Sequence, residues 1–124
     1  MPKRAQPEAQ LQRAVAQFLE RALGPGVMWR MVENKPRSKI AGAQQKGRGV
    51  QAGTPDILLW WYDGFGAIEL KSMTGHLRES QRDFWAEFKA IGGLYAVCRA
   101  VDNVETTLLA WKLPLRASLK AKRA

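Results

Sequence analysis

The sequence has one cysteine, Cys98, and one histidine, His76. A single cysteine forms neither an internal disulfide nor a cysteine-based metal cluster, and it suits a reducing compartment. With one imidazole, a zinc site built from His and Cys lacks ligands, and a serine-type catalytic triad has a single candidate base. These shortages exclude much of the usual enzyme repertoire.

Long apolar runs are also missing. The longest, over residues 57–62, is far shorter than the roughly 20 residues that span a bilayer. No apolar stretch near Met1 has the character of a signal peptide. We therefore expect a soluble, cytoplasmic protein without a membrane partner.

Acidic residues are few. The chain has 11 Asp plus Glu against 20 Lys plus Arg, which gives a formal net charge of +9 and a pI near 10.2. Such an excess in a short chain predicts a polyanionic partner. Nucleic acid is favoured over an anionic membrane, because the sequence has no basic amphipathic helix rich in Trp and Leu.

The length of 124 residues, with 46% apolar and 25% charged residues, is typical of one globular domain. We place it at residues 1–115, followed by a basic tail over 116–124. Helical spacing of apolar residues predicts helices over residues 8–23, 78–91 and 102–111. Strand patterns occur at residues 27–33, 57–62, 65–72 and 94–99. Because residues 57–62 are apolar on both alternating sets, we expect an α/β fold in which helices flank both faces of a small mixed sheet, in the order α-β-β-β-α-β-α.

A glycine-rich basic segment over residues 35–53 contains no acid. Its cations are Lys35, Arg37, Lys39, Lys46 and Arg48. We expect a flexible loop that contacts phosphates and becomes ordered on binding, because cation contacts to phosphate need little preformed geometry. The alternative is a solvated, disordered insertion.

Asp63-Gly64 lies between two β-prone runs and is a strong hairpin signal. A two-residue turn there pairs Asp56 with Lys71 and makes Glu69 a diagonal neighbour of Asp56. Opposed residues share a face and side chains alternate along a strand, so these three side chains project from the same side of the sheet.

Two carboxylates in a largely apolar setting repel each other, and the arrangement makes sense if a cation with oxygen preferences binds between them. Mg²⁺ or Mn²⁺ fits this description, and either ion supplies Lewis acidity and an activated water. Lys71 is placed to orient the attacking water or to stabilise charge on the phosphorus oxygens. The alternative is a solvated strand of alternating charges, which Leu58 and Trp60 beside Asp56 disfavour.

Four segments together resemble the PD-(D/E)XK nuclease pattern in its VRR-NUC form, the small stand-alone type found in phages and bacteria. They are Gly53-Thr54-Pro55-Asp56, Glu69-Leu70-Lys71-Ser72, Gly75-His76-Leu77 and Gln81. The resemblance covers most of the chain, from Glu8 to about Trp111. It implies a restriction-endonuclease-like core in a bacterial or phage-infected cell. Arg78 stands where the family usually has Ser or Thr, so the following helix is expected to shift its start by a residue or two.

The resemblance also implies roles for individual residues. Asp56 and Glu69 bind the divalent metal with help from the Leu70 carbonyl, and Lys71 assists the nucleophilic water. Gln81 points inward to hold Lys71 or the scissile phosphate. Glu8 approaches the metal site from the first helix, through water or at a second metal.

Nucleic-acid contacts are expected from Asn34, which matches a family position at a strand end, and from the basic loop. His76 is either near phosphate or simply exposed. Together these features predict a Mg²⁺-dependent endonuclease acting on DNA, selective for branched structures such as four-way junctions and active as a homodimer. The alternatives are a non-catalytic nucleic-acid-binding module on the same scaffold and an RNA-directed nuclease.

Overall fold

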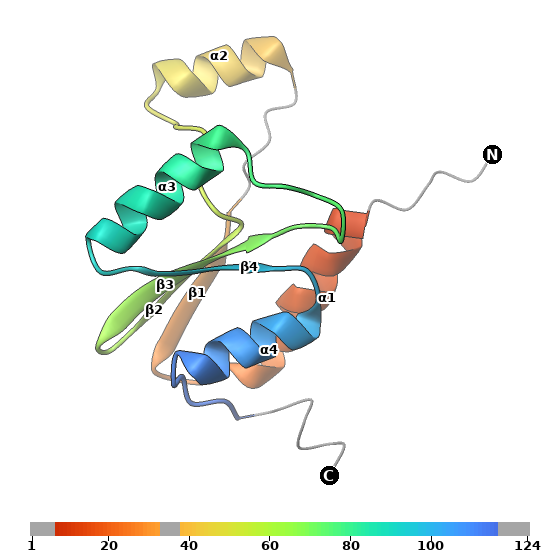
Figure 1. The fold of residues 1–124 in the computed structure, drawn as a ribbon, viewed down its shortest axis with the longest axis vertical. Helices are drawn as coiled ribbons and strands as arrows, with labels where there is room; N and C mark the ends of the chain where they lie inside the picture. Colours follow the sequence, from red (N-terminus) through yellow and green to blue (C-terminus); the bar gives the residue numbers. More distant parts are fainter. Residues whose placement is uncertain (1–6, 33–37, 117–124) are drawn as a thin grey trace, which may run out of the picture.

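A computed structural model describes residues 7–32 and 38–116 of the chain, so most of the basic tail lies outside the described residues. Figure 1 shows its helices and strands. In chain order these are α1 (Pro7–Ala22), β1 (Val27–Met31), α2 (Lys39–Gly47), β2 (Ile57–Trp61), β3 (Gly64–Leu70), α3 (Glu79–Ala90), β4 (Leu94–Cys98) and α4 (Val101–Ala110). The described residues include no helix long and apolar enough to cross a membrane.

The four strands form one mixed sheet in the order β1-β2-β3-β4. β1, β2 and β3 pair antiparallel, and β3 pairs parallel with β4 after the chain crosses over through α3. α1 and α4 pack on one face of the sheet, and α3 covers part of the other (Figure 1). The α/β fold with helices on both faces is confirmed.

The hydrophobic core lies between the sheet and the pair α1 and α4. Alternation along β2 sends Ile57 and Leu59 into this core, and Ile68 joins them from β3. The opposite set on β2 faces the α3 side, where Leu58 is half-buried and Trp60 is 37% exposed. The α3 side of the sheet therefore stays partly open, and Asp56 and Glu69 belong to this side.

The hairpin register differs from the predicted one by two residues. Trp61 pairs with Gly64, so the two turn residues are Tyr62 and Asp63 rather than Asp63 and Gly64. The Trp61 indole covers Gly64 so closely that a Cβ there would lie 2.8 Å from its Nε1. A shift of two preserves the face of every side chain, and continuing the register beyond Ile57 and Ile68 brings Asp56 opposite Glu69 instead of diagonal to it.

The expectation of an irregular basic loop is wrong in part, because the segment contains the helix α2. Ser38 is the N-cap, and its Oγ accepts a hydrogen bond from the Ala41 N–H at 3.0 Å. α2 contributes no buried residue and stands apart from the sheet (Figure 1). The strand β1 ends at Met31, and the predicted contact residues Asn34, Lys35 and Arg37 lie outside the described residues.

Candidate active site

The carboxyl groups of Asp56 and Glu69 lie on neighbouring strands. Asp56 directly precedes β2, and its Oδ2 accepts a hydrogen bond from the Leu70 N–H at 2.8 Å. Glu69 is only 4% exposed, and its Oε1 accepts a hydrogen bond from Gln81 Nε2 at 2.9 Å. The other oxygen, Oε2, is buried and has no hydrogen-bond donor among the residues that the structure describes. An unpartnered buried carboxylate oxygen is costly unless a proton or a cation occupies the site.

The pKa of Glu69 is raised from its ordinary value of 4.5 to about 8. Burial is the largest cause, and the charge of Asp56 and a side-chain hydrogen bond with Asp56 also raise this pKa, whereas the positive charges of Lys71 and Arg78 lower it. The raised pKa favours the protonated form of the Glu69 carboxyl.

These properties fit a hard divalent cation, which prefers oxygen ligands and replaces the shared proton as the neutralising charge. Asp56 and Glu69 are the residues that would hold it, with the Leu70 carbonyl as the candidate third ligand. Within residues 7–32 and 38–116, no group of three His, Cys, Asp or Glu side chains is gathered closely enough to hold a metal. A cation at this pair would thus depend on backbone, water and substrate oxygens, as Mg²⁺ commonly does.

Gln81 fixes the orientation of Glu69. It is 4% exposed in the first turn of α3, and its Oε1 accepts a hydrogen bond from the Arg78 N–H at 2.8 Å. Arg78 is the N-cap, so the Gln81 side chain caps the helix with one atom and binds Glu69 with the other. The inward direction of Gln81 agrees with prediction, but its hydrogen-bond partner is Glu69 rather than Lys71.

Gly53 fixes the distance between the Asp56 segment and α3. Its φ is +92°, and a Cβ at this position would lie 2.3 Å from the backbone oxygen of Ser80. Only glycine allows the two backbones to approach this closely. The glycine of the Gly-Thr-Pro-Asp segment therefore sets the place of Asp56 relative to Gln81.

Lys71 and Glu8 both border Gly75 in the loop that follows β3. Lys71 is 7% exposed, and its N–H donates to the Cys98 carbonyl at 3.0 Å. A Cβ on Gly75 would lie 3.5 Å from both Glu8 Oε1 and Lys71 Cδ. The first turn of α1 thus brings Glu8 to Gly75, which Lys71 also borders, and not into a three-carboxylate group with Asp56 and Glu69.

Arg99 is a site residue that sequence reasoning missed. Its Nη1 donates to the carbonyl oxygens of Ser72 at 2.5 Å and Gly75 at 2.8 Å, which ties down the loop beside Lys71. Tyr95, in β4, was missed as well. Neither had a sequence signal, because the pairing partner of β4 does not follow from the sequence.

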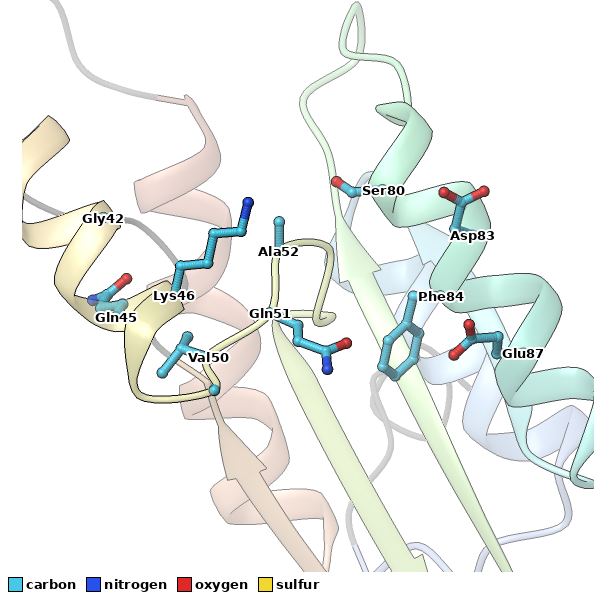
Figure 2. Close-up of a pocket in the computed structure, with 11 residues that line it drawn as sticks. Gly42, Gln45, Lys46, Val50, Gln51, Ala52, Ser80, Asp83, Phe84 and Glu87 are labelled. Atoms are coloured by element: carbon cyan, nitrogen blue, oxygen red, sulfur yellow. The ribbon is translucent and has the colours of Figure 1, made fainter.

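A groove of about 740 Å³ separates α2 and the segment after it from α3. Figure 2 shows Gln51 and Phe84 pointing toward each other across it, with Lys46 on the α2 side and Asp83 and Glu87 on α3. The predicted contact residues Lys39, Lys46, Arg48 and His76 are exposed. Among the described residues, the cation Lys46 therefore borders one side of the groove and the carboxylates of Asp83 and Glu87 border the other.

The fold and the site define an α/β domain of the PD-(D/E)XK nuclease type, with Asp56, Glu69 and Lys71 at the motif positions. The family model of the VRR-NUC domain matches residues 6–102, and the chain belongs to this family. The family is nuclease-like, and membership supports a nuclease or DNA-binding role. No curated protein matches the chain.

Two solved structures share the fold. One, described as a VRR_NUC domain protein, is 20% identical, with a TM-score of 0.69 over 90% of this chain and 93% of the other. The second, a VRR_NUC domain, is 17% identical, with a TM-score of 0.57 over 86% of this chain and 97% of the other.

Proposed function

We propose that this protein is a metal-dependent endonuclease that hydrolyses DNA phosphodiester bonds. The observation that carries the proposal is the unpartnered, buried Oε2 of Glu69 beside the carboxylate of Asp56. A structural ion pair would leave no such oxygen, whereas a divalent cation uses it. The proposed ion is Mg²⁺ or Mn²⁺.

The residues have distinct tasks in this proposal. Asp56 and Glu69 hold the cation; the Leu70 N–H orients Asp56, and Gln81 orients Glu69. When bound, the cation supplies Lewis acidity and an activated water. The Lys71 ammonium orients the attacking water and stabilises charge on the phosphate oxygens. Water adds to phosphorus, the bond to the 3′ oxygen breaks, and the products are a 5′-phosphate and a 3′-hydroxyl.

One observation supports a role for Glu8 at Lys71. The Glu8 Oε1 and the aliphatic part of Lys71 both border Gly75. A carboxylate on this side of the loop attracts the ammonium group and so helps to direct it. We therefore propose that Glu8 helps to position Lys71. We also propose that Glu8 contacts the metal site through water or at a second metal, as the family resemblance implies.

The substrate we propose is branched DNA, including four-way junctions. Three exposed cations lie on α2 and at its C-cap: Lys39, Lys46 and Arg48. Because the helix contributes no buried residue, we propose that it serves to contact phosphates. Asp83 and Glu87 repel phosphates on the α3 side of the groove. The DNA backbone therefore follows the α2 side. Contacts of this kind do not read sequence, which favours recognition of structure.

We also propose that the active form is a homodimer, because a junction presents two equivalent strands to a symmetric pair of sites. We propose the cytoplasm as its location. The open sheet face supports this assembly: Met28 is 49% exposed and Trp60 is 37% exposed, and these two residues pair across β1 and β2. Sedimentation of the full chain, with and without junction DNA, measures the oligomeric state.

The test is cleavage of labelled linear, flapped and four-way-junction DNA with Mg²⁺, Mn²⁺ or EDTA. Wild type is compared with Lys71→Ala and Asp56→Asn, and with Lys89→Ala as a matched control on the surface of α3. We expect metal-dependent cutting of branched DNA that both site variants lose by at least about 100-fold and that Lys89→Ala retains. Tight junction binding without cutting under every condition would refute the nuclease and support a binding module; faster cutting of RNA would redirect the substrate.

A further inference from the structure

Tyr95 lies beneath α3 on the same face of the sheet as Glu69. It pairs with Ala67 across β3 and β4, and Glu69 is two residues further along β3, so the three side chains share a face. The hydroxyl oxygen of Tyr95 is buried and has no hydrogen-bond partner among residues 7–32 and 38–116. In the part of the chain that the structure describes, the side-chain polar atoms in this condition are Glu69 Oε2, Trp85 Nε1 and Tyr95 Oη.

Two residues of helix α3 contact Glu69 and Tyr95. Gln81 and Trp85 are four residues apart and therefore lie on one face of the helix. Gln81 binds Glu69 at 2.9 Å, and the Trp85 indole stacks on the Tyr95 ring with centroids 5.0 Å apart and an interplanar angle of 16°. The phenol of Tyr95 is thereby locked in orientation by the same helix that orients the metal-binding carboxylate.

Charges of the site act on the Tyr95 hydroxyl. Burial raises the pKa of this phenol, and the negative charges of Glu69 and Asp56 raise it further. The hydroxyl therefore keeps its hydrogen at all physiological pH values and is available as a donor. A buried hydroxyl without a partner costs about 1–3 kcal/mol, which phenylalanine of almost the same shape avoids.

We infer that Tyr95 is a positioning residue of the metal-binding pair: its hydroxyl, which has no partner among the described residues, donates a hydrogen bond to a water in the oxygen shell of a divalent cation held by Asp56 and Glu69. This inference rests on the proposed function and adds a residue from β4, outside the sequence motif. Tyr95 contacts neither the substrate nor the reacting atoms. It acts by holding ligand oxygens in place, as outer-shell partners of metal ligands do.

The experiment compares Tyr95→Phe with Tyr62→Phe, which alters the chain's only other tyrosine, a fully exposed residue of the hairpin turn. Calorimetric titration with Ca²⁺ and with Mn²⁺ measures ion affinity without DNA and without turnover. We expect Tyr95→Phe to weaken ion binding by about 10-fold and Tyr62→Phe to leave it unchanged. Thermal unfolding in EDTA is measured in parallel, and there Tyr95→Phe is expected to be at least as stable as wild type.

An unchanged ion affinity in Tyr95→Phe, with ion binding and cleavage intact in wild type, would overturn this inference and leave the nuclease proposal standing. A wild type that binds neither ion would overturn both. If Tyr95→Phe unfolds at a lower temperature in EDTA than wild type, ion binding is compared between Asp56→Asn and Asp56→Asn/Tyr95→Phe. Equal residual ion responses in these two proteins support the positioning role, and a further 10-fold loss contradicts it.

Discussion

Replacing Glu69 with Gln is expected to remove a pH dependence of stability that this one side chain creates. The folded protein raises the Glu69 pKa from 4.5 to about 8, so between these values it keeps a proton that the unfolded chain has lost. The stabilisation is complete below the unfolded pKa and is lost as pH rises through the folded one. At 1.36 kcal/mol per pH unit, wild type without metal loses about 2 kcal/mol between pH 6 and pH 8.

The assay is thermal unfolding in EDTA at pH 6, 7 and 8. For a domain of this length, about 2 kcal/mol lowers Tm by about 8 °C. Glu69→Gln mimics the protonated carboxyl at every pH and is expected to show a nearly flat profile. Saturating Ca²⁺ is expected to restore wild-type stability at pH 8 and to do little for the variant, because the cation needs the ionised pair.

Both proteins are also measured with His76→Gln, which removes the only imidazole of the chain. The reasoning is refuted if Glu69→Gln loses as much stability as wild type between pH 6 and pH 8. It is equally refuted if wild type in EDTA gains stability over that range.

Two further predictions address the backbone and the charged helix. Gly53→Ala is expected to cost about 2–5 kcal/mol of unfolding free energy, because a left-handed alanine is strained and its Cβ meets the Ser80 oxygen at 2.3 Å. The control Gly49→Ala has a similar φ of +90° and nothing within 4 Å, so chemical denaturation should show a loss of only about 1–2 kcal/mol; equal losses would contradict the close approach. The double variant Lys46→Gln/Arg48→Gln is expected to reduce the slope of log affinity for junction DNA against log salt concentration by about 2. The control Lys89→Gln/Lys112→Gln is expected to leave this slope unchanged. A slope in the first variant equal to that of wild type would exclude α2 from the DNA contact.

Local pattern was enough to predict most of the fold. The apolar spacing of α1 and the unbroken apolar run of β2 predict a helix and a doubly covered strand, because burial of those side chains is required wherever the elements lie. α2 was missed because its helix buries nothing, so no apolar stripe marks it. The predicted hairpin register differs from the observed one by two residues, because the Trp61 indole packs over Gly64. Rules for turn sequences do not include such a contact.

Within the site, the sequence by itself determined the face shared by Asp56, Glu69 and Lys71, because side chains alternate along a strand and a shift of two residues preserves the face. Only the tertiary structure decided what surrounds Glu69: Gln81 on one oxygen, Tyr95 nearby on β4, and no partner on the other oxygen. Those neighbours come from elements far apart in the chain. These side chains come together only when α3 packs on the sheet and β4 pairs with β3. The burial that raises the pKa of Glu69 depends on that packing.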